Sequence, residues 1–126
     1  MQYDPAEEPD REEWLAIDEA ERLLLIEAYH RRARFRLPNE KVHAVIHAIV
    51  ENQIALGDEL PVRRTAERLM AEGLDRHQAI HAIGSLLNEH IFDLIHHSEA
   101  GVEVDANQPY FAALERLTAE NWRQSN

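Results

Sequence analysis

Two segments of the chain share the pattern His-x-x-Ile-His-Ala-Ile: His43-Ala-Val-Ile-His47-Ala-Ile49 and His77-Gln-Ala-Ile-His81-Ala-Ile83. Residues four positions apart lie on one face of an α-helix, so each segment presents two imidazoles along the edge of an apolar face. We expect the two faces to pack together and to bring the histidine pairs into one cluster. The apolar residues with helical spacing are Val42, Val45, Ile46, Ile49 and Val50 beside the first pair, and Ile80, Ile83, Leu87, Ile91 and Leu94 beside the second.

Cap and stop signals extend the helical prediction to the rest of the chain. Asp10 and Glu13 have the spacing of a capping box, and so do Asp75 and Gln78. Gly57 is a typical residue just beyond the end of a helix. We expect helices at about 11–34, 40–56, 62–72, 76–97 and 108–121, and at most a very short strand at 102–105.

These signals predict an all-α fold, a single-domain bundle of about five helices in which the two longer core helices each carry a histidine pair. The length of 126 residues fits one domain, spanning 1–126. We expect residues 1–9 and 122–126 to be frayed, as chain ends often are.

The composition narrows the classes of partner. Acidic residues number 24 against 13 basic ones, a formal net charge of −11, so we expect neither nucleic acid nor an anionic membrane surface as a partner. No cysteine is present, which excludes disulfides and thiolate metal sites. The first residues lack an apolar run and no stretch reaches the ~20 apolar residues of a membrane span. We therefore expect a soluble, cytoplasmic protein.

The histidine pairs predict a binding site for one divalent transition metal, Zn²⁺, Fe²⁺ or Ni²⁺, because these ions accept imidazole nitrogens. The expected ligands are His43, His47, His77 and His81. Glu51 lies four residues beyond His47 and is a candidate fifth ligand or a partner behind the ligands. No His-Glu-x-x-His metalloprotease motif is present, and no paired Glu-x-x-His segments of the ferritin-like di-iron type. The other histidines, His30, His90, His96 and His97, are interpreted as structural or solvated.

Two functions follow from this pattern. The first function is metal binding. A metal site with an open coordination position could support hydrolytic or redox chemistry, whereas four histidines without an open position favour a structural metal, and we favour this non-catalytic role. The second function, kept as the alternative, is a metal-free module for protein–protein interaction or dimerisation, which docks through its acidic first helix to a second copy or another protein. In that case the histidines would be bonded to water and nearby carboxylates.

The segments Glu51-Asn-Gln-Ile-Ala-Leu-Gly-Asp58 and Gly73-Leu-Asp-Arg-His-Gln-Ala-Ile-His-Ala-Ile-Gly84, together with His43, resemble a bacterial family of small helical proteins classed as a domain of unknown function. The resemblance covers about residues 40–95. It implies that the two histidine pairs act as a unit and names no reaction. Many members have Glu where this chain has Gln78, a departure that would remove a possible carboxylate ligand or base.

Overall fold

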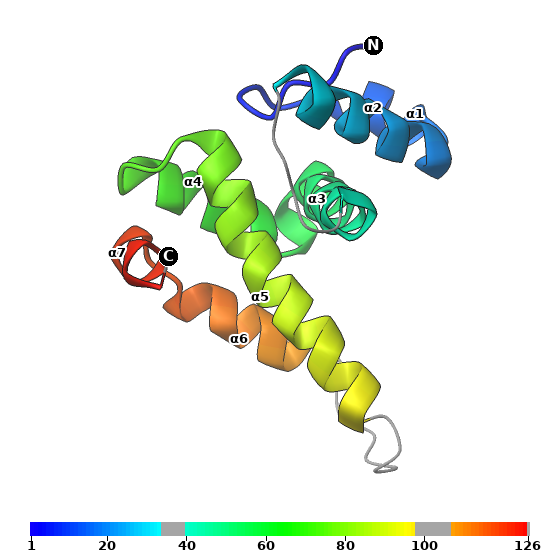
Figure 1. The fold of residues 1–126 in the computed structure, drawn as a ribbon. Helices are drawn as coiled ribbons and strands as arrows, with labels where there is room; N and C mark the ends of the chain where they lie inside the picture. Colours follow the sequence, from blue (N-terminus) through cyan, green and yellow to red (C-terminus); the bar gives the residue numbers. More distant parts are fainter. Residues whose placement is uncertain (34–39, 98–106, 126) are drawn as a thin grey trace.

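All regular elements described by the computed structural model, which covers residues 1–33, 40–97 and 107–125, are helical (Figure 1). The all-α prediction is therefore confirmed for these ranges. The elements are α1 (Arg11–Ala16), α2 (Glu19–Arg32), α3 (Glu40–Ala55), the short 3₁₀ helix η1 (Gly57–Glu59), α4 (Val62–Ala71), α5 (Arg76–His97), α6 (Gln108–Arg116) and α7 (Ala119–Gln124). The strand expected at 102–105 lies outside the described residues.

The described residues form seven α-helices rather than about five, because the first and last expected helices are each divided by an internal cap. Ile17 is extended, and the Asp18 side chain accepts the Ala20 N–H at 3.2 Å to start α2. The Arg22 guanidinium donates to the Ile17 and Leu15 carbonyls, which the end of α1 leaves without helical partners.

The second division lies between α6 and α7. Thr118 is extended and forms a capping box with Asn121, so a new helix starts where the sequence predicts a continuous one. The three central helices end within one residue of their expected bounds. The capping box of Asp75 and Gln78 is present, with the Gln78 N–H donating to Asp75 at 2.7 Å.

Helix α3 lies between two layers, with α1 and α2 on one side and α5 with its neighbours on the other (Figure 1). Each layer has its own buried hydrophobic cluster, and α3 contributes to both. One cluster contains Trp14 and Ile26 with Ala44 and Ala48 of α3, and the other contains Val50 with residues of α4 to α7. The contacts on both sides of α3 place it at the centre of the fold.

Three consecutive residues of α3 bond to three different parts of the molecule. Glu51 pairs with Arg76 of α5, Asn52 accepts from Trp14 of α1 and Arg22 of α2, and Gln53 accepts from Tyr110 of α6. Neighbouring residues on a helix point about 100° apart, which lets a tripeptide reach three sides.

The predicted apolar faces are partly wrong in both helices, and in α5 the exception is Leu94, which is 41% exposed. Ile80, Ile83 and Leu87 are buried, as expected. Val42 and Val45 are instead 49% and 41% exposed. Helix α2 packs against the side of α3 that carries Ala44, Ala48 and the histidines, because small residues allow two helices to approach closely. Val42 and Val45 lie outside this contact and stay partly exposed.

Within residues 1–9, which the sequence predicts to be frayed, Tyr3 and Pro5 are buried, while most of the other residues are exposed. Tyr3 is 2% exposed, and its ring lies 5.7 Å from that of Trp14. Its carbonyl accepts from Arg32 at 3.0 Å, and the Pro5 carbonyl accepts from Arg76 at 3.0 Å. At the other end, where residues 122–126 are expected to fray, α7 continues to Gln124.

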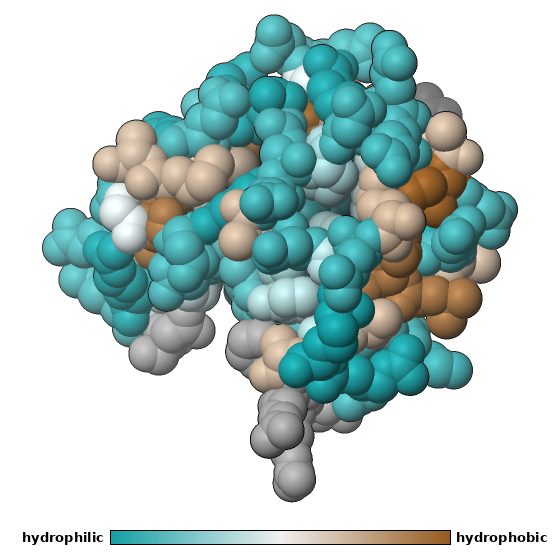
Figure 2. All heavy atoms as spheres, turned by 90° about the horizontal axis from the view of Figure 1, so that it is seen from above, coloured by the Kyte–Doolittle hydropathy of each residue, from teal (hydrophilic) through white to brown (hydrophobic). Residues whose placement is uncertain are grey.

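Hydrophilic side chains cover most of the face that carries α1 and α2, with hydrophobic atoms gathered at one edge (Figure 2). None of the helices in the described ranges is both long enough and apolar enough to cross a membrane.

Gly84 sits at the contact between α5 and α3, where a Cβ atom would lie 3.0 Å from Cγ2 of Ile46. The Ile46 side chain therefore occupies the space that Gly84 leaves beside the helix backbone. We expect Gly84→Leu to lower the free energy of unfolding by about 1–3 kcal/mol through overpacking. Urea unfolding measures this loss, with Asn88→Leu at an exposed position of the same helix as the control. Equal stabilities of the two variants would contradict the close contact.

Candidate metal centre

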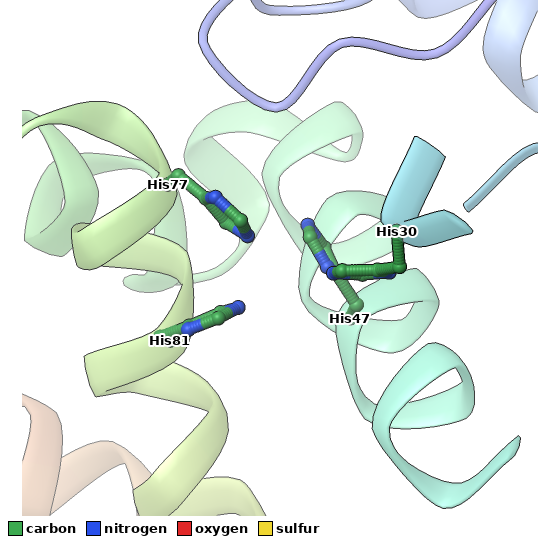
Figure 3. Close-up of side chains that lie close together, drawn as sticks. All are labelled: His30, His47, His77 and His81. Carbon is green, nitrogen blue, oxygen red and sulfur yellow. The ribbon is translucent and has the colours of Figure 1, made fainter. Parts of the chain in front are cut away.

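Four imidazoles from three helices point into one space between α2, α3 and α5 (Figure 3). His30 comes from the last turn of α2, His47 from the middle of α3, and His77 and His81 from the first turns of α5. One ring nitrogen from each lies within 4.8 Å of the others, so the set could hold a metal ion. Nitrogens around a tetrahedral Zn²⁺ ion lie roughly 3.3 Å apart, which means that the rings must close in by on the order of 1 Å to bind it.

His43 is the fifth member of the cluster. Its Nε2 atom lies 3.1 Å from Nε2 of His81, and its ring centroid lies 4.8 Å from that of His30. The structure thus brings together all four histidines of the two sequence pairs, as their shared helical phase predicts. The 3.1 Å separation fits either a hydrogen bond between the two rings or two neighbouring ligands of one ion.

His30 is interpreted from the sequence as structural or solvated and is not among the expected ligands. The structure contradicts the solvated position, because His30 is 5% exposed and its ring is one of the four that meet between α2, α3 and α5. The adjacent Arg31 and Arg32 favour an exposed position in the sequence. The available signal was the four-residue spacing from Ile26, which is fully buried on the same face of α2. Nδ1–H of His30 donates to the Ile26 carbonyl at 3.0 Å, which fixes the proton on Nδ1 and leaves the lone pair on Nε2.

Glu51 lies behind the histidines and does not face them as a ligand would. Its two oxygens accept from Arg76 at 2.7 and 2.8 Å, and Oε2 also accepts from the Tyr3 hydroxyl. The same hydroxyl lies 2.6 Å from Nε2 of His47. Of the two roles predicted for Glu51, the geometry favours that of a partner reached through Tyr3.

The cluster favours neutral imidazoles. Burial, followed by repulsion from the neighbouring rings, lowers the pKa of His47 well below its usual value and that of His81 to about 3. Burial is also the main reason that the pKa values of His30, His43 and His77 are lowered. At neutral pH the rings therefore keep the lone pairs that a metal ion needs.

Carboxylates at the rim act in the opposite direction and would attract a cation. The charges of Asp75 and Asp4 raise the pKa of His77, and that of Glu40 raises the pKa of His30, although burial outweighs both. These three carboxylates are exposed, which leaves a negative rim around a neutral, partly buried centre.

His90, His96 and Gln78 are not among the residues that meet at the cluster. His90 is buried and stacks on Tyr110 with ring centroids 5.6 Å apart, whereas His96 is exposed and bonds the Phe92 carbonyl. The side chain of His97 is outside the described residues. Gln78 is exposed and accepts from the Asp75 N–H at 3.0 Å, so its side chain caps the start of α5.

We expect the metal-free protein to lose stability as the pH falls below about 6.5. The unfolded histidines take up protons near that pH, while the buried ones resist until a lower pH, so the stability present above 6.5 is lost on acidification. Each histidine that protonates only when unfolded lowers the free energy of unfolding by up to about 1.4 kcal/mol per pH unit. Urea unfolding in EDTA at pH 7.5, 6.5 and 5.5 tests this. The slope should be shallower in His81→Gln than in the wild type, and identical slopes in the two proteins would refute the assignment.

No family model, curated protein or solved structure matches the chain. Membership of the bacterial family whose motifs the chain resembles therefore stays a prediction. The function has to be inferred from the site itself.

Proposed function

We propose that the protein binds one divalent transition-metal ion between α2, α3 and α5. The observation that carries the proposal is the convergence of four imidazole nitrogens within 4.8 Å, with a fifth imidazole beside them. The ligand set predicted from the two sequence pairs thereby gains His30 from a third helix.

The hydrogen-bonding needs of buried imidazoles support a metal ion. A buried polar atom without a partner costs about 1–3 kcal/mol. Nδ1 of His47 is buried and has no hydrogen-bond partner among the described residues. Protonation of His47 would turn the unpaired nitrogen into a donor, but burial disfavours the charged form and lowers the pKa of the ring. One cation can accept several of these lone pairs at once.

The donor set indicates the class of ion. Imidazole nitrogens suit Zn²⁺, Ni²⁺ and Fe²⁺, whereas Mg²⁺ and Ca²⁺ prefer oxygen ligands. The nearest buried carboxylate, Glu51, is already engaged by Arg76 and Tyr3. We infer a nitrogen-only site for a borderline transition-metal ion.

A stabilising role fits this site better than a catalytic one. Catalytic zinc sites keep one position for water or substrate, whereas four or five protein nitrogens fill the coordination sphere. The three helices that carry the ligands belong to two hydrophobic clusters: α2 packs in one, α5 packs in the other, and α3 contributes to both. An ion at this place would add a link between α2 and α5.

We expect Zn²⁺ to raise the melting temperature of untagged protein at pH 7.5. Binding to the folded state at a hundredfold excess over Kd adds about 2.7 kcal/mol, or on the order of 10 °C for a domain of this size. Differential scanning fluorimetry should show this shift in the wild type and in His96→Gln, but not in His47→Gln or His81→Gln. Equal shifts in all four proteins would place the ion at the acidic surface. No shift in any of them would favour the metal-free interaction module.

The structure also predicts that His30 contributes to affinity. Isothermal titration with Zn²⁺ should give one ion per chain, and His30→Gln should weaken binding at least tenfold, the equivalent of about 1.4 kcal/mol for one lost ligand. His43→Gln measures the contribution of the fifth imidazole in the same way. If His30→Gln binds like the wild type while His43→Gln does not, the four-histidine set predicted from the sequence is the correct one.

A further inference from the structure

A buried chain of polar side chains leads from Arg76 through Glu51 and Tyr3 to His47. Arg76 is 8%, Glu51 1% and Tyr3 2% exposed, and His47 is equally buried at 2%. Arg76 donates two N–H groups to Glu51, Tyr3 donates its hydroxyl proton to Glu51, and the Tyr3 oxygen lies 2.6 Å from Nε2 of His47. Water is excluded from these atoms, so their donors and acceptors must match one another.

The direction of each hydrogen bond in the chain can be assigned. A guanidinium only donates, and a carboxylate that receives two of its N–H groups accepts. Tyr3 has a single hydroxyl proton, and Glu51 receives it. The contact between Tyr3 and His47 is then a hydrogen bond only if Nε2 of His47 carries a proton and donates it to the Tyr3 oxygen. This places the ring in the Nε2–H tautomer and leaves the lone pair on Nδ1.

We propose that Tyr3 is a positioning residue that fixes His47 in the Nε2–H tautomer and so makes Nδ1 the atom that binds the metal. The proposal rests on the metal site proposed above. Nδ1 is the buried nitrogen of His47 with no hydrogen-bond partner among the described residues. Hydrogen bonds from the outer nitrogen of a histidine ligand commonly set its tautomer and orientation.

The segment before α1 is therefore part of the metal centre although it supplies no ligand. Arg76 donates both to Glu51 and to the Pro5 carbonyl, and Arg32 donates to the Tyr3 carbonyl. These bonds hold the backbone at Tyr3 and two residues beyond it. The arrangement complements that of His30, whose Nδ1–H is held by a backbone carbonyl, so that Nε2 carries the lone pair.

The test combines the tautomer with the affinity for Zn²⁺. Long-range ¹H–¹⁵N NMR of the metal-free wild type should show the Nε2–H tautomer for His47. In Tyr3→Phe the ring remains but the hydroxyl is lost, so we expect a mixture of tautomers and a Kd for Zn²⁺ that rises ten- to a hundredfold. The matched control is Tyr110→Phe, because Tyr110 is also 2% exposed and loses one hydroxyl bond, to Gln53. It should keep both the tautomer and the affinity of the wild type.

Each contrary outcome has its own meaning. An Nδ1–H tautomer in a wild type that binds Zn²⁺ would overturn the assignment of Nδ1 and leave the metal site intact. Equal affinities of Tyr3→Phe and Tyr110→Phe would overturn the positioning role. Absence of Zn²⁺ binding by the wild type would overturn the proposed function and the ligand assignment together.

Discussion

The buried ion pair between Glu51 and Arg76 is the interaction on which the rest of the structure depends. It joins α3 to the start of α5 with bonds of 2.7 and 2.8 Å, and these two helices carry the histidine pairs. Removing one partner of a buried ion pair leaves an uncompensated charge and typically costs about 3–5 kcal/mol. The pair also bonds the N-terminal segment, through the Tyr3 hydroxyl and the Pro5 carbonyl. A single electrostatic contact thus connects the N-terminal segment, the central helix α3 and the histidine cluster.

Buried polar side chains, among them Glu51, Arg76 and His47, form a polar layer, here called the polar seam, between the two hydrophobic clusters. Asn52 and Gln53 extend it on α3, where they bond Trp14 and Tyr110 on opposite sides. Burying polar atoms stabilises a fold only when each finds a partner, which also makes such a seam specific for one arrangement. The Glu51–Arg76 part of the seam is satisfied by the protein itself. Among the histidines, Nδ1 of His47 is buried and has no hydrogen-bond partner in the described part of the chain, and this difference supports the proposed metal site.

The centre of the histidine cluster is electrically neutral, whereas the residues around it carry negative charge. Burial keeps the imidazoles neutral and available as ligands, while exposed carboxylates around His30 and His77 favour a cation nearby. The excess of acidic residues over the whole chain acts in the same direction. A neutral donor set in a negative surround binds a divalent ion without losing protons, so the affinity should hold at neutral pH and fall on acidification.

The sequence by itself determined the helical class, most of the helix bounds and the phase of the histidine pairs, because caps and four-residue spacings are local properties of the chain. It did not determine which neighbour covers each face. Tyr3 lies 44 residues from His47 in the chain, and its burial depends on how the first segment crosses α3. His30 joins the cluster because α2, which starts after the break at Ile17, packs against α3. Glu51 has the spacing of a ligand, but tertiary structure placed Arg76 beside it, and a buried carboxylate pairs with the cation that lies nearest.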